Sequence, residues 1–148
     1  MNFVYIGRVV SPVREPIDID WGEVESSVRL YTEYAPGLLG LDQFSHAIVV
    51  THLHKAEWDP HNHLLRHPQE REDMPLLGIF AQRARHRPNS IGVTAVSIIN
   101  VKENELTVRG LDAIDGTPVL DIKPYVPQYD KRDATIPQWM EQLMKDYF

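Results

Sequence analysis

Short segments of alternating or continuous hydrophobic residues, rich in β-branched side chains, recur along this chain. Residues 4–10 and 24–34 alternate loosely between apolar and polar positions, which predicts two strands, the second of them half exposed. Residues 44–53 are almost continuously apolar, and this predicts a strand that is covered on both faces. Pro12 and Pro36 follow the first two segments and end them, because proline removes a donor from the strand ladder.

The second half of the chain repeats the β-rich pattern. Residues 91–101 and 106–110 predict a hairpin that turns at Glu103 and Asn104, and residues 119–126 predict a further strand. These segments are short and separated by turn residues, as in a sheet built from antiparallel neighbours.

Two other segments do not follow this pattern. Residues 55–76 mix histidines, acids, bases and prolines without the period of a strand or a helix, which predicts a long irregular excursion. Residues 136–148 have apolar residues at helical spacing after Pro137, which predicts one C-terminal helix packed on the body. Many short strands with one helix indicate a mainly β protein, most simply a small closed β-barrel.

Composition narrows the class of protein. The chain has 148 residues, 43% of them hydrophobic, and we expect residues 1–148 to form a single domain. It has no cysteine, which excludes disulfides, thiolate metal sites and a cysteine nucleophile. With no membrane-spanning run and no signal-peptide pattern, we expect a cytoplasmic protein without a membrane partner. The net charge of −6 argues against a protein that binds nucleic-acid phosphates non-specifically over its whole surface. A local basic patch remains compatible with this charge.

Charge is concentrated in two loops. The basic loop, residues 83–89, leads through Gly92 into a predicted strand, and the acidic loop, residues 110–118, follows the predicted hairpin. Their polar residues include Arg83, Arg85, Arg87, Asn89, Asp112 and Asp115. Each loop could be an ordinary solvated turn, but both are more polar than a connection requires. We therefore predict that they form the two sides of one binding site, with Asn89 and Gly92 able to adopt unusual backbone angles.

Histidines form a third candidate group. His52 and His54 alternate, as do His61 and His63, and this spacing would suit metal ligands on one strand face. No carboxylate stands at a familiar metal spacing and the second pair lies in a polar loop, so we expect no metal site. His54, beside Lys55 at the end of a predicted strand, is the better candidate for a ligand contact.

Five sequence blocks carry a resemblance to a known family. They are residues 7–12, 41–46, 78–83, 87–92 and 110–125. With these blocks the chain resembles, over nearly all its length, the TrmO family, also called the TsaA or YaeB-like family. It departs from many relatives at Gln82, and at Ser90, where they have a second proline.

The resemblance implies a β-barrel methyltransferase that binds S-adenosylmethionine and forms a homodimer. Its implied acceptor is the exocyclic amine of threonylcarbamoyladenosine, next to the tRNA anticodon. Carried over by motif, the implied cofactor contacts are His54, Lys55, Arg83, Gly92, Leu111, Asp112 and Ala113. Methyl transfer from a sulfonium needs positioning and exclusion of water, and no metal.

The loop chemistry adds roles on the substrate side. We expect Arg85, Arg87 and Asn89 to bind the anticodon loop, since single-stranded RNA is held through phosphates and splayed bases. Asp115 is the first candidate for a general base. Other functions remain open: a cofactor-binding module without catalysis, a methyltransferase with a different acceptor, or a metalloenzyme built on the histidines.

Overall fold

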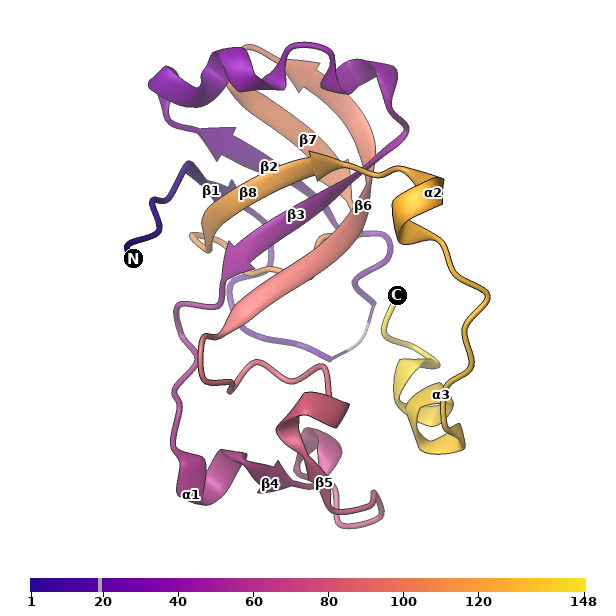
Figure 1. Cartoon of the computed structure of the whole chain (residues 1–148). Helices are drawn as coiled ribbons and strands as arrows, with labels where there is room; N and C mark the ends of the chain where they lie inside the picture. The colour runs from indigo at the N-terminus through magenta and orange to yellow at the C-terminus, as the bar shows by residue number, and fades with distance from the viewer. Residues whose placement is uncertain (19) are drawn as a thin grey trace.

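A closed barrel of six antiparallel strands dominates the computed structural model, which describes residues 1–18 and 20–148 (Figure 1). The strands follow the order β1-β2-β7-β6-β3-β8 around the barrel, and pairing of β1 with β8 closes it. The prediction of a mainly β protein with a small closed barrel is thus confirmed. The barrel strands are β1 (Gly7–Val10), β2 (Glu25–Leu30), β3 (His46–His52), β6 (Ile91–Lys102), β7 (Glu105–Arg109) and β8 (Pro118–Pro124).

The long strand β6 changes partner along its length. Its first half is in register with β3, from Ile91 opposite His52 to Ser97 opposite His46. From Ser97 onward it is in register with β7, and the register shifts between Ile98 and Asn100. The acidic loop, which follows β7, can therefore run beside the first half of β6.

Alternating side chains fill the barrel. In β3, Ala47 and Val49 are buried while Ile48 and Val50 on the opposite face are only half buried. The prediction that this strand is covered on both faces is therefore wrong, because the outer wall of a small barrel is in contact with solvent even where it is apolar. The hairpin of β6 and β7 is confirmed, and Glu103 in its turn has φ 56°.

Two predicted strands are shorter than the sequence pattern suggested. The strand expected over residues 4–10 begins at Gly7, and the one expected over residues 24–34 ends at Leu30. The chain after it forms a 3₁₀ helix, Thr32–Leu38, with Pro36 inside it. Another 3₁₀ turn, Leu41–Gln43, leads into β3.

Residues 55–76 leave the barrel as a mostly irregular excursion, as predicted (Figure 1). It is organised by a small ladder in which Leu65 pairs with Gly78 and Arg66 with Leu77. Its elements are α1 (Pro60–His63), β4 (Leu65–Arg66), the 3₁₀ turns Pro68–Glu70 and Ile79–Ala81, and β5 (Leu77–Gly78).

The helix predicted within residues 136–148 is confirmed, though it is shorter, and one further helical turn precedes it. A single turn, α2 (Pro127–Asp130), precedes α3 (Gln138–Met144), whose apolar residues Trp139 and Leu143 are half buried. After α3 the chain turns back toward one end of the barrel (Figure 1). Among the residues that the structure describes, no helix is both long and apolar enough to span a membrane.

Candidate functional site

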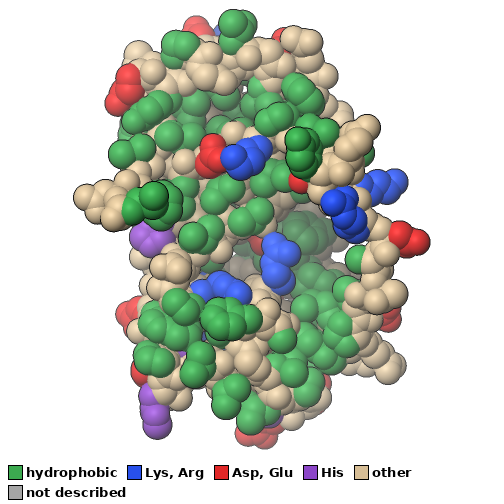
Figure 2. All heavy atoms as spheres, viewed as in Figure 1, with side chains coloured by type: hydrophobic (Ala, Val, Ile, Leu, Met, Phe, Trp, Pro, Cys, Tyr) green, Lys and Arg blue, Asp and Glu red, His purple; other side chains and the backbone are tan. Residues whose placement is uncertain are grey.

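The basic and acidic loops meet at one end of the barrel, which we call the site rim. At this end β3 finishes while β6 and β8 begin, since Thr51 is in register with both Gly92 and Val119. The amide of Leu53 donates to the carbonyl of Ser90 at 2.8 Å and so joins the end of β3 to the basic loop. The surface is hollowed between the barrel and the C-terminal segment, with basic side chains near the hollow (Figure 2).

Asp112 lies at the centre of the polar contacts at the site rim. One carboxylate oxygen accepts a hydrogen bond from the hydroxyl of Thr94, and the other accepts one from the hydroxyl of Tyr147 at 2.7 Å. Thr94 belongs to the half of β6 that pairs with β3. The neighbours Leu111 and Ala113 are buried in the core, so only their backbone groups could contact a ligand.

Arg83 approaches the same place from the basic loop. Its guanidinium donates to the carbonyl of Val93 at 3.0 Å, and its side chain is exposed. Val93 directly precedes Thr94, whose hydroxyl donates to Asp112, so Arg83 and Asp112 are bonded to adjacent residues of β6. The structure thus brings together the arginine and the aspartate that the sequence predicted on opposite sides of one site.

His54 and Lys55 follow β3 at the site rim, and both are exposed. Partial burial lowers the pKa of His54, and the neighbouring charges of Lys55 and His52 lower it further. The imidazole is therefore mostly neutral near pH 7 and able to accept a hydrogen bond, while Lys55 supplies an exposed cation.

The expectation about unusual backbone angles is wrong in detail. The left-handed residue of the basic loop is Ser90, with φ 46°, rather than Asn89 or Gly92. Its hydroxyl donates to the carbonyl of Arg87 at 3.1 Å, which helps to hold this conformation. Gly92 is required for a different reason: a Cβ there would lie 2.5 Å from Oγ1 of Thr51.

The three polar residues that were predicted to bind the RNA substrate differ in their surroundings. Arg85 and Asn89 are exposed, and Arg85 donates to the ring of His86 at 3.3 Å. Arg87 is half buried and its guanidinium donates to the carbonyl of Gln82 at 2.6 Å. Arg85 and Asn89 are thus placed to meet a substrate, whereas Arg87 folds back on its own loop.

Asp115 also has a structural partner. Its carboxylate accepts a hydrogen bond from the amide of Ser11 at 3.0 Å, and its own amide donates to the carbonyl of Val13 at 2.7 Å. These bonds tie the acidic loop to the chain after β1. Its role as a general base stays a prediction.

The histidines are dispersed among separate contacts. His52 bonds to the hydroxyl of Tyr5 at 2.6 Å, His67 lies 2.7 Å from the carbonyl of Met74, and His63 stacks on His86 with ring centroids 4.6 Å apart. Within the described ranges, 1–18 and 20–148, no three His, Asp or Glu side chains converge in a way that could hold a metal ion.

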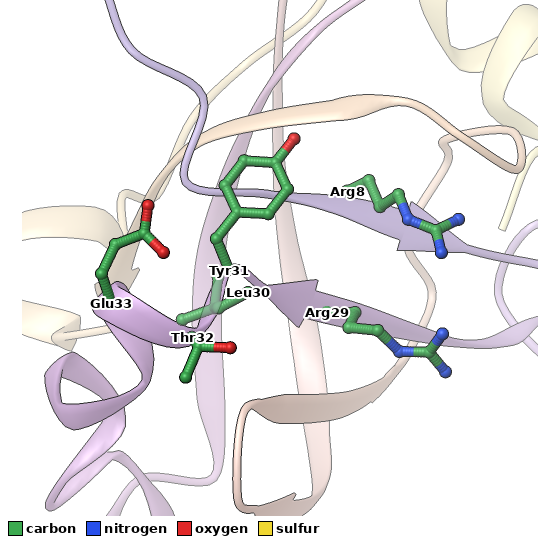
Figure 3. A pocket seen from close by; sticks show the side chains of 6 residues that line it. All are labelled: Arg8, Arg29, Leu30, Tyr31, Thr32 and Glu33. Carbon is green, nitrogen blue, oxygen red and sulfur yellow. The ribbon is translucent and has the colours of Figure 1, made fainter.

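A hollow of about 450 Å³ lies elsewhere, on the barrel wall (Figure 3). Its lining includes Arg8 and Arg29, which are cross-strand partners on β1 and β2, together with Tyr31 and Glu33. None of the predicted site residues lines it. Arg29 in this hollow is already paired with Glu105 at 2.9 Å, and none of the lining residues belongs to the basic or the acidic loop.

Sequence reasoning missed two residues of the site rim, Thr94 and Tyr147. Thr94 was read as an ordinary strand residue, and Tyr147 as part of a helical apolar face. The only signal was the alternation in β6, which points Thr94 inward among apolar neighbours where a hydroxyl needs a partner.

The fold and the rim define a small antiparallel β-barrel protein with polar side chains gathered at one barrel end. Residues 14–131 match the family of tRNA-methyltransferase O N-terminal domains. The chain belongs to this family.

Relatives and a solved structure agree with this assignment. The chain is 39% identical over 131 residues to an S-adenosyl-L-methionine-binding protein of Archaeoglobus fulgidus, covering 84% of this chain and 89% of that protein. It is 37% identical over 105 residues to the human tRNA (adenine(37)-N6)-methyltransferase, covering 69% of this chain and 23% of that protein. A crystal structure of TrmO from Pseudomonas aeruginosa superposes with a TM-score of 0.76 at 31% identity, over 94% of this chain and 61% of that one.

Proposed function

We propose that this protein is an S-adenosylmethionine-dependent tRNA methyltransferase that modifies the exocyclic amine of an adenosine beside the anticodon. The match of residues 14–131 to the tRNA-methyltransferase O family carries the proposal. The names of relatives support both halves of it, because one is called a cofactor-binding protein and another a tRNA adenine methyltransferase. Threonylcarbamoyladenosine is the acceptor that we propose.

The donor set at the site rim fits the cofactor. Asp112 provides a half-buried carboxylate for an ammonium group or ribose hydroxyls, and a carboxylate facing a cation is a strong contact in a partly dry site. The backbone groups of Leu111 and Ala113 are available because their buried side chains fix the loop. His54, Lys55, Arg83 and the chain at Gly92 complete the set that we propose.

S-adenosylmethionine, when bound, supplies a methyl group on a positively charged sulfur. The protein's part is to hold the acceptor amine in line with that group and to keep water out. Arg85 and Asn89 are exposed beside the site rim and would hold the phosphates and bases of the anticodon loop. Asp115 would take the amine proton on Oδ2, while Oδ1 accepts from the amide of Ser11.

A radiolabelled methyl-transfer assay tests this function. Purified protein, tritiated cofactor and unfractionated tRNA should give labelled tRNA, and nucleoside analysis should find the label on threonylcarbamoyladenosine. tRNA from cells that cannot make this nucleoside should stay unlabelled. Label on another nucleoside would refute threonylcarbamoyladenosine as the acceptor, while the protein would still be a tRNA methyltransferase.

A cofactor-binding module without catalysis is the second candidate, since a relative that shares 39% identity is named only for binding. Calorimetry with S-adenosylmethionine and its demethylated product separates the two. Binding without transfer to any tRNA would favour the module, and absence of binding would refute both.

A homodimer is part of the proposal. Leu65, Leu76 and Phe80 expose 60%, 60% and 79% of their surface, and the pairing of Leu65 with Gly78 places all three near the ladder of β4 and β5. Such clustered apolar side chains commonly lie in protein interfaces. Sedimentation should give twice the monomer mass for the native chain and the monomer mass for Phe80→Glu; a native monomer would refute this part.

A further inference from the structure

The C-terminal segment, residues 146–148, is fixed on the chain that precedes β2. The amide of Asp20 donates to the carbonyl of Asp146, and the amide of Trp21 to the carbonyl of Tyr147, both at 2.8 Å. Trp21 is itself only 2% exposed, and its indole donates to the carbonyl of Ile17 at 2.9 Å. The segment therefore rests on a buried anchor.

This anchoring brings the phenol of Tyr147 to the site rim. Its hydroxyl donates to one oxygen of Asp112 at 2.7 Å, while Thr94 donates to the other. A carboxylate has about four acceptor positions, so these two donors leave others for a ligand. Two donors on two oxygens fix the plane of the group, and with it the direction of the remaining lone pairs.

Tyr147 is suited to be a permanent donor. Burial raises the pKa of its phenol, and the nearby charge and hydrogen bond of Asp112 raise it further, with Asp18 adding to the effect and Arg83 opposing it. The hydroxyl therefore keeps its proton near neutral pH and well above it. It cannot serve as a base, and its contribution is one of geometry.

We propose that Tyr147 is a positioning residue of the cofactor site, whose hydroxyl holds Asp112 in the orientation that receives S-adenosylmethionine. The inference rests on the proposed function. Tyr147 lies beyond residues 14–131, so the family match does not include it. The segment after the barrel thereby completes a site that the barrel loops only begin.

A Tyr147 hydroxyl that blocked the cofactor's position on Asp112 would give a different change in affinity. If the Tyr147 hydroxyl occupied the acceptor position that the cofactor needs, its removal would strengthen binding. If it orients the carboxylate, its removal weakens binding. The sign of the change in affinity therefore separates the two.

Calorimetry with S-adenosylmethionine and with its demethylated product, on the full chain, provides the test. Tyr147→Phe should weaken binding about tenfold, as expected for loss of a hydrogen bond to a charged group. Tyr129→Phe is the matched control, because this phenol is 80% exposed on α2, and it should bind as the native protein does. Thermal unfolding of both variants verifies the fold.

A double-mutant cycle shows whether Tyr147 acts through Asp112. Asp112→Asn should weaken binding strongly, and adding Tyr147→Phe to it should have little further effect. In the methyl-transfer assay, Tyr147→Phe should raise KM for the cofactor while kcat changes little.

Unchanged or tighter binding by Tyr147→Phe, or full additivity with Asp112→Asn, would overturn the inference while the proposed function stands. A native protein that binds neither compound would overturn the proposed function itself, and the inference with it.

Discussion

Replacing Gly22 by alanine tests whether the C-terminal segment is a built part of the site. The new Cβ would lie 2.6 Å from the carbonyl carbon of Phe148 and 3.2 Å from its Cα. Non-bonded carbons prefer a separation of about 3.5 Å or more, so the segment must move by most of an ångström. Both contacts are with backbone, which no change of rotamer can relieve.

The cost follows from the contacts that such a shift removes. The bonds from Asp20 to Asp146 and from Trp21 to Tyr147 hold the segment, and each has a net value of about 0.5–1.5 kcal/mol. Losing both lowers the free energy of unfolding by about 1–3 kcal/mol. Cofactor affinity should fall together with stability, because Tyr147 leaves Asp112.

Urea denaturation and amide hydrogen exchange measure the two effects. Gly37→Ala is the matched control, since a Cβ at Gly37 has nothing within 4 Å. In Gly22→Ala the amide of Trp21 should exchange faster than in the native protein, and in Gly37→Ala it should not. If Gly22→Ala unfolded at the same urea concentration as Gly37→Ala and kept the Trp21 amide protected, the packing argument would be refuted.

Three further predictions concern the basic loop. Gln82→Ala should lower the free energy of unfolding by about 1–3 kcal/mol in urea titrations, because the buried amide donates to two backbone carbonyls of the excursion, which would lose their partner. Arg87→Ala should lower stability by about 1–2 kcal/mol, whereas Arg85→Ala should keep stability and weaken tRNA binding several-fold in filter binding at fixed salt; the reverse result would contradict the roles read from their contacts. Burial, with Arg85 and His63 adding to it, lowers the pKa of His86 below 6.5, so the unfolded chain takes up this proton first. The contribution of neutral His86 to the free energy of unfolding should therefore be fully present above about pH 7 and be lost as the pH falls through the lowered pKa. In denaturant titrations, His86→Gln should lose less stability than the native protein between pH 7.5 and pH 5.5.

The barrel could be predicted because its signals are local. The strand period, the proline after β1, and the hairpin turn at Glu103 and Asn104 each lie within a few residues of the feature they determine. The meeting of the two loops was predicted from their shared polarity. The errors at β3 and after Leu30 arise where the exposure of an outer face, or the fit of a turn, depends on parts of the chain distant in sequence.

The centre of the site could not be predicted because its contacts are long-range. The bond from Tyr147 to Asp112 spans 35 residues, and that from Thr94 to Asp112 spans 18. A tyrosine at helical spacing looks the same in sequence whether its hydroxyl faces water or a carboxylate. The return of the chain after α3 (Figure 1) shows that the Tyr147 hydroxyl faces a carboxylate and not water.

The same reasoning separates residues that build the loops from residues that face a ligand. Arg87 and Asp115 are chemically suited to bind a substrate, yet both are bonded to backbone groups of their own surroundings. An arginine whose guanidinium is held by a backbone carbonyl must turn away from that carbonyl to face a ligand, and the lost bond weakens its net contribution. Arg85 is exposed, and Asp112 is held by two hydroxyls that leave acceptor positions open. Arginine contacts to a ligand at this rim should therefore be stronger from Arg85 than from Arg83 or Arg87, which are bonded to the carbonyls of Val93 and Gln82.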